Sequence, residues 1–333
     1  MGHRYRALRR RILTPDTSAT KLDVRGFHRR SPDSQELLET IGRTFLSGYA
    51  YAAEAKETAD AEDRLETIPA RFRGFAYEGA GMGFAVRDGL PLGGSGHVRG
   101  LLAGRGDAHI YMVYVGIGWA MARLPRFRWP ATDGMDPLLR WLVLDGYGFH
   151  QAYFHTRRYV HERYQDARFP WPADDPHSYA NHAIDQGIGR ALWFVAGTDS
   201  ALVAATVDRF PESRRADLYG GVGLAATYAG GADERELRAL WEYAGPYRSM
   251  LAQGCSFAAE ARERAGLVVP HNEEATRILC GTTVAEAARI SRDTRPEPEG
   301  PGEPPAFETW RQRIAAAFDA HARGTVPAGG QAT

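Results

Sequence analysis

Apolar residues recur every three or four positions over long stretches of this chain, and they seldom alternate with polar residues. Near the N-terminus, Leu38, Ile41 and Phe45 fall on one helical face. Ser31 and Pro32 precede them as a capping residue and a proline at the first helical position. The pattern predicts a helix from there to about residue 56 and, over the whole chain, an all-α fold.

The same periodicity predicts further helices at 72–87, 107–124, 137–164, 181–196, 199–208, 216–229, 233–243 and 245–265, and one or two more within 271–291. The acidic, alanine-rich stretch 54–66 is expected to be a solvated connector instead. A loop with at most one short helix is expected at 91–106, and an irregular turn at 125–136, because turn-forming residues are frequent in both segments.

Six segments share a short glycine core that is flanked on both sides by apolar, helix-forming residues. Five cores are Gly-x-Gly and one is Gly-Cys-Ser, with first glycines at 79, 116, 146, 187, 221 and 254. A helix is expected to pass through each core, although glycine within a helix costs about 1 kcal/mol relative to alanine. Close helix packing is the favoured explanation, and room for a ligand against bare backbone is the alternative.

The spacing of the cores predicts about six helical-hairpin repeats, arranged as an α/α toroid or a compact helical solenoid. A toroid would enclose a central cavity suited to a small molecule. Along the chain we expect a basic N-terminal arm at 1–30, a helical-repeat domain at 31–294 with halves at about 31–168 and 176–294, a Pro/Glu/Gly linker at 295–305, a C-terminal docking helix at 306–323 and a flexible tail at 324–333.

Composition narrows the classes of function. The 41 basic residues balance the 41 acidic ones, which argues against nucleic acid as a partner. The longest apolar stretch, 110–122, is shorter than the ~20 residues that span a membrane, and no apolar segment typical of a signal peptide follows the N-terminal arginines. Two cysteines do not suggest a disulfide framework. We therefore expect a soluble, cytoplasmic protein.

Two carboxylates stand at matching places in their repeats. Glu78 and Asp145 directly precede the first glycine of a core, where Gln186 and Gln253 stand in two other repeats. An acid pair in an apolar cavity can act as proton donor and acceptor, with raised pKa values. The commoner role of such an acid is to cap or brace a neighbouring helix. His150 is the auxiliary catalytic candidate.

The segment 142–161 carries three histidines, His150, His155 and His161, which point in different directions around a helix. A metal site built on this helix alone is disfavoured, because helical ligand pairs favour a spacing of four residues. A metal or haem site that uses residues from other helices stays an alternative, with Glu78, Asp145, His182 or His271 as partners. The sequence implies no particular cofactor.

A set of motifs spans residues 7–290: LRRRILTPD, VRGFHRR, RGFAYEGAGMGFAV, LDGYGFHQAYFH, IDQGIGRALWFVAG, RRADLYGGVGLAATYAGG, LAQGCSFAAEARERAG and PHNE. Together they resemble the bacterial UnbL family, a domain of unknown function encoded in enediyne natural-product clusters. Where that family often has His-Thr-Glu, this chain has His271-Asn272-Glu273. The linker and the final helix lie outside the likeness.

The resemblance implies a role in building or maturing an enediyne core from a polyketide polyene, and it brings no established catalytic residues. The first hypothesis is an enzyme whose cavity binds a hydrophobic polyene and promotes its cyclisation, rearrangement or oxidation, with Glu78, Asp145 and His150 as catalytic candidates. The further residues expected to bind substrate are Tyr77, Tyr147, Gln186, Arg190, Gln253 and His271. The alternatives are a non-catalytic polyene-binding, chaperone or scaffold module that works with other biosynthetic proteins, and a haem- or metal-dependent protein.

Overall fold

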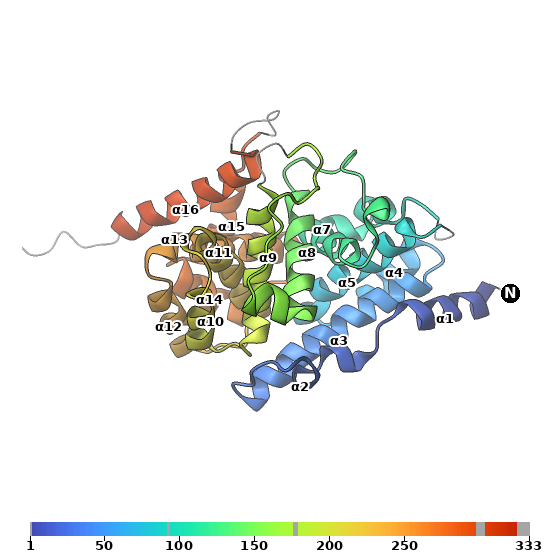
Figure 1. Ribbon diagram of the computed structural model, residues 1–333, viewed down its shortest axis with the longest axis horizontal. Helices are drawn as coiled ribbons and strands as arrows, with labels where there is room; N and C mark the ends of the chain where they lie inside the picture. Colours follow the sequence, from blue (N-terminus) through green and yellow to red (C-terminus); the bar gives the residue numbers. More distant parts are fainter. Residues whose placement is uncertain (1, 92–93, 176–178, 298–303, 325–333) are drawn as a thin grey trace, which may run out of the picture.

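A computed structural model describes residues 2–91, 94–175, 179–297 and 304–324. All the regular elements in these ranges are helical (Figure 1). The predicted all-α fold is confirmed. Six residues of the expected linker, 298–303, and nearly all of the expected tail, 325–333, lie outside the described residues.

Seven helices form the body of the molecule, and each packs on the next along the chain. In Figure 1 the last six follow one another from right to left, and the first runs obliquely below them. Their bounds are α3 (Pro32–Glu54), α5 (Ala70–Gly89), α7 (Ile110–Met121), α8 (Trp141–Phe154), α9 (Ala180–Val195), α11 (Glu212–Ala229) and α13 (Arg248–Arg264). The first begins as the sequence predicts, because the Ser31 and Ser34 side chains form a reciprocal capping box before Pro32.

The glycine cores lie where these helices cross. A Cβ atom on Gly146 of α8 would stand 2.0 Å from the carbonyl oxygen of Val115 in α7, and one on Gly187 of α9 would stand 1.9 Å from that of Asp145 in α8. No side chain fits at such a distance, so the backbones touch directly. The packing explanation for the glycines is confirmed at these crossings.

The carbonyl groups that face the first glycines of the second to sixth cores belong to equivalent positions, because each comes from the residue directly before a glycine core. The carbonyl oxygens of Glu78, Asp145 and Gln186 each face the first glycine of the next core along the chain, at 2.1, 1.9 and 1.9 Å from its added Cβ. These three residues therefore occupy equivalent places on α5, α8 and α9. Their side chains differ in charge, and all three are buried.

Shorter helices cover the outside of the body. They are α1 (Gly2–Leu13), α2 (Leu22–Arg25), α4 (Thr58–Leu65), α6 (His97–Ala103), α10 (Ser200–Val207), α12 (Glu234–Ala244), α14 (Pro270–Leu279) and α15 (Val284–Asp293), with short 3₁₀ turns at Thr17–Thr20, Arg105–His109, Arg126–Arg128 and Gly245–Tyr247. The last helix, α16 (Ala306–Gly324), packs on α13 and α15. Its apolar face is buried, through Phe307, Trp310, Ile314 and Phe318.

Two expectations are wrong. The stretch 54–66 is not a solvated connector, because most of it forms α4. Ala61 and Leu65 lie one turn apart among acidic residues in the sequence. Both side chains are buried, and they pack this helix on its neighbours. The expected helix 137–164 is too long: α8 ends at Phe154, His155 leaves helical geometry, and a separate π-helical turn follows at Arg157–His161.

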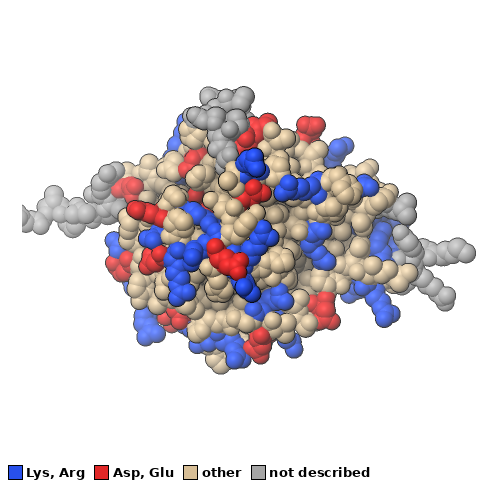
Figure 2. All heavy atoms as spheres, in the orientation of Figure 1, with Lys and Arg blue, Asp and Glu red and all other residues tan. Residues whose placement is uncertain are grey.

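The distribution of charged side chains on the surface agrees with the equal numbers of basic and acidic residues in the chain (Figure 2). Figure 2 shows basic and acidic side chains interspersed over the face in view rather than gathered by sign. Within the described ranges, none of the helices combines the length and the apolar character that a bilayer-crossing segment needs.

Candidate functional site

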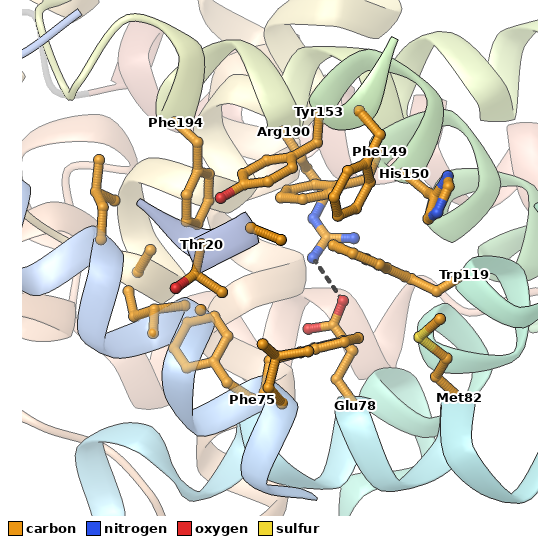
Figure 3. A pocket seen from close by; sticks show the side chains of 18 of the residues that line it. Thr20, Phe75, Glu78, Met82, Trp119, Phe149, His150, Tyr153, Arg190 and Phe194 are labelled. Carbon is orange, nitrogen blue, oxygen red and sulfur yellow. Dashed lines mark ion pairs between the residues drawn. The ribbon is translucent and has the colours of Figure 1, made fainter. Parts of the chain in front are cut away.

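The helices α3, α5, α7, α8, α9 and α11 surround a cavity of about 450 Å³, and the segment that includes the 3₁₀ turn Thr17–Thr20 closes one side (Figure 3). This volume falls in the range of pockets that bind small molecules. Most of its wall is apolar, and aromatic rings supply a large share: Phe45, Phe75, Trp119, Phe149, Tyr153, Phe154 and Phe194. The wall therefore offers mainly apolar and aromatic contacts.

The wall helix α5 turns one stripe toward the cavity and two of its glycines toward a neighbouring helix. On α5 the cavity stripe is Phe75, Glu78 and Met82, at the spacing of one helical face. The adjacent Gly79 and Gly83 lie against the backbone of α3. The same local pattern therefore provides close packing on one face and a lining side chain on the other.

Glu78 is the acidic side chain in the cavity wall. It is 3 % exposed, and burial raises its pKa to about 7. The Arg190 guanidinium opposes this shift, with Nη2 at 3.8 Å from Glu78 Oε1, and the negative charge of Asp145 adds to it. In Figure 3 the carboxyl group of Glu78 points at Arg190 across the cavity wall. Near neutral pH this carboxyl group can both give and take a proton.

Asp145 has a different role from Glu78 although the two are equivalent in the repeat. It is fully buried and forms an ion pair with Arg190. Its second oxygen accepts a hydrogen bond of 2.8 Å from Gln186 Nε2. Asp145 does not line the main cavity; it lines a separate void of about 30 Å³, and Arg190 and Tyr228 line both spaces. Asp145 therefore braces Arg190 from behind.

Among the buried polar atoms of cavity-lining residues that lack a hydrogen-bond partner in the described ranges are His150 Nδ1 and the hydroxyl group of Tyr228. Burial, helped by the nearby charge of Arg123, lowers the pKa of His150 to about 3, so its imidazole is neutral at physiological pH. An unpaired buried polar group costs about 1–3 kcal/mol. Both atoms are covered by protein, and the Tyr228 hydroxyl group lies against Gly74 of α5.

The remaining candidate residues lie away from the cavity. Tyr77 faces the other side of α5, where it donates a 2.6 Å hydrogen bond to Glu66 and stacks on His109. Tyr147 packs against Trp129 and Phe169. In separate places, Gln253 accepts a hydrogen bond from Arg311, and His271 lies 3.3 Å from the carbonyl oxygen of Tyr228.

The structure thus brings Glu78, His150 and Arg190 to one cavity, with Asp145 and Gln186 behind Arg190. Sequence reasoning missed the aromatic wall and Tyr228. A usable signal was present on α5, where Phe75 and Met82 share a helical face with Glu78. It was absent for Trp119, because α7 is apolar on nearly all sides.

The histidines near α8 do not converge. His150 lines the cavity, His155 lies at its exposed end, and His161 ends the π-helical turn. Over the described part of the chain, no group of three His, Cys, Asp or Glu side chains is arranged to hold a metal ion.

Comparison with known proteins places the chain in a family. No curated protein and no solved structure matches it. One family model does match, over residues 4–318, which includes most of α16 as well as the whole helical body. The chain therefore belongs to the family described as "Protein of unknown function (DUF1702)".

Proposed function

We propose that this protein is an enzyme that binds a hydrophobic polyene in the cavity and isomerises or cyclises it by proton transfer from Glu78. The observation that carries the proposal is one carboxyl group, with a pKa near 7, set in an aromatic wall. A proton donor works best when its pKa lies near the working pH.

The chemistry balances without an oxidant or reductant. Glu78 gives its proton to one carbon of the conjugated chain, which leaves a delocalised cation on the chain. A second double bond then attacks the cation and closes a ring, or the cation stays open. Loss of a proton from carbon to the Glu78 carboxylate ends the reaction, so the product is an isomer of the substrate.

The surrounding residues favour both the acid and the cation. While Glu78 is protonated, the charges of Arg190 and Asp145 offset each other. Once Glu78 has given up its proton, Arg190 lies 3.8 Å from the carboxylate and stabilises it. The faces of rings such as Trp119 and Phe149 can stabilise a cation on the ligand.

The polyene in this proposal comes from the likeness to the UnbL-type motifs. On that basis we infer an accessory role in enediyne biosynthesis, in which the substrate is a polyketide-derived polyene. An aromatic, largely apolar cavity of about 450 Å³ is compatible with such a chain. Conjugated double bonds also offer the carbon atoms that a proton transfer of this kind requires.

A non-catalytic polyene carrier is the second candidate. The observation that favours it is the scarcity of charged groups deep in the cavity, where Glu78 and Arg190 are surrounded by apolar side chains. Such a wall would also shield an unstable polyene from water. The two candidates differ in whether the Glu78 proton is used.

The test begins with deletion of the gene in its host and mass spectrometry of the accumulated polyene. That polyene is incubated in D₂O with the purified wild-type protein, with Glu78→Gln and with Glu212→Gln, a control at an exposed acid. We expect wild type and the control to incorporate deuterium on carbon and form an isomer, while Glu78→Gln binds the polyene without converting it. Equal conversion by all three proteins would contradict the role of Glu78, binding without conversion by any would support the carrier, and absence of binding would refute both candidates.

A further inference from the structure

The cavity has an exposed end, which we call the mouth and define by Arg123, Phe154 and His155. All three line the cavity, but Arg123 and His155 are exposed and Phe154 is half-buried, whereas Glu78, which also lines it, is 3 % exposed. A second hollow adjoins the mouth, because it shares Tyr153, Phe154 and His155 with the main cavity. A ligand can therefore extend from the apolar interior to the surface.

Basic side chains gather at this mouth. Arg123 lines the cavity there, and Arg25 places its guanidinium 5.1 Å from the centre of the Phe154 ring. Arg157 and Arg158 line the adjoining hollow as well. Glu162 is the acid in this lining, and it is engaged by Arg157 at 2.9 Å. The mouth thus carries more positive than negative charge, although the whole chain is balanced.

Two of these arginines lack an anionic partner. Within the described ranges, neither Arg25 nor Arg123 forms an ion pair or donates a side-chain hydrogen bond, and Arg25 Nε is also buried without an acceptor. Glu39 is the nearby acid on α3, but it already accepts hydrogen bonds from the backbone N–H of Leu22 and from Gln35. Arg158 differs, since it stacks 3.7 Å from the centre of the Tyr164 ring.

We propose that the ligand is an amphipathic anion, with its apolar chain in the cavity and a terminal carboxylate or phosphate held by Arg25 and Arg123 at the mouth. This inference rests on the proposed use of the cavity and names the chemical class of its ligand. Arginine binds both anions through paired N–H donors. The geometry also sets the orientation of the chain, because the anionic end stays at the mouth while the apolar end reaches Glu78.

The test uses parinaric acid, a conjugated tetraene carboxylic acid whose fluorescence rises in an apolar site, and its methyl ester as the neutral match. Fluorescence titration gives the dissociation constant of each probe for the full-length protein. We expect the acid to bind about tenfold more tightly than the ester. Raising the ionic strength should weaken binding of the acid and leave the ester unchanged.

Variants separate the mouth from the cavity. Arg123→Ala and Arg25→Gln should each weaken binding of the acid by about threefold and leave binding of the ester unchanged, and circular dichroism checks that both variants are folded. Arg209→Ala is the control, because Arg209 is an exposed arginine away from the cavity lining. Competition by dodecanoate or by dodecyl phosphate then shows which anion is preferred, and dodecanol is the neutral competitor.

The outcomes distinguish this inference from the proposed function. Equal binding of acid and ester, or an unchanged affinity for the acid in both arginine variants, would overturn the anion site while leaving the cavity as a polyene site. Failure of both probes to bind would overturn this inference and, with it, the proposed use of the cavity. Tight binding of the acid that depends on Arg25 and Arg123, together with no deuterium incorporation, would support the anion site and reject catalysis by Glu78.

Discussion

The Oε1 atom of Glu78 lies 3.8 Å from Nη2 of Arg190, a guanidinium that is already paired with Asp145 on its other side. Two carboxyl groups from α5 and α8 thus share one cation from α9. The cluster is buried, so a second negative charge is costly there. Asp145 forms the ion pair with Arg190, and the pKa of Glu78 is raised to about 7.

Glu78 should make the stability of the protein depend on pH. Its pKa rises from 4.5 to about 7 on folding, so between these values the native state holds a proton that the unfolded state has released. This group therefore lowers the free energy of unfolding as the pH rises from about 4.5 to 7, by about 3 kcal/mol in all at 1.36 kcal/mol per pKa unit.

The variant Glu78→Gln removes this titration, and urea unfolding from pH 4 to 9 measures it. The free energy of unfolding of the variant, relative to that of wild type, should increase as the pH rises from about 4.5 to 7. Above about pH 8 this difference should no longer change with pH. Buried histidines such as His150 titrate with the opposite sign in both proteins, so the difference between the two proteins isolates Glu78. A difference that does not change with pH would show that the carboxyl group is ionised throughout.

Asp145→Asn should destabilise the fold because it removes the closer of the two carboxyl groups that Arg190 contacts and leaves Glu78, at 3.8 Å, as the remaining one. Removing one member of a buried pair typically costs about 3–5 kcal/mol. The double variant Asp145→Asn/Arg190→Met, which removes the stranded charge, should recover part of that loss. Chemical denaturation of the single and double variants measures both effects. A double variant less stable than Asp145→Asn alone would contradict the bracing role assigned to Asp145.

Gly187→Ala tests the helix crossings. The added Cβ would stand 1.9 Å from the carbonyl oxygen of Asp145, so α8 and α9 must move apart, and we expect a loss of about 3 kcal/mol or more. Gly100→Ala in α6 is the matched control. Its Cβ would meet the side chain of Thr58 at 3.2 Å, so it should stay within about 1 kcal/mol of wild type. Equal stability of the two variants would mean that α8 and α9 can move apart at little cost in free energy.

The sequence predicts the fold better than the site because the two depend on different ranges of interaction. A glycine core flanked by helix-forming residues is a local pattern, and close packing is its direct physical consequence. The same register places Glu78 and Asp145 at equivalent positions. It does not say that Arg190 pairs with one of them, since that depends on three helices meeting. The short helix α4 was missed because Ala61 and Leu65 provide its small apolar face among many acids.

Removing the hydroxyl group of Tyr228 should affect the stability of the protein and its affinity for ligands in different ways. Tyr228 lines the cavity, and its hydroxyl group is buried without a partner among the described residues, so Tyr228→Phe removes a desolvated group without loss of a hydrogen bond. We expect this variant to unfold at the same or a higher urea concentration than wild type. Its affinity for parinaric acid, which has no polar group at the deep end, should be unchanged.

Tyr77→Phe is the control for that comparison, because the Tyr77 hydroxyl group donates a 2.6 Å hydrogen bond to Glu66 outside the cavity. Loss of this charge-assisted bond should cost about 1.5–3 kcal/mol and leave probe binding unaltered. With the polyene from the deletion strain, Tyr228→Phe should bind more weakly than wild type if that ligand carries a polar group near Glu78. A destabilised Tyr228→Phe would instead show that its hydroxyl group has a partner in the folded protein, and a role in ligand binding would then lose its physical basis.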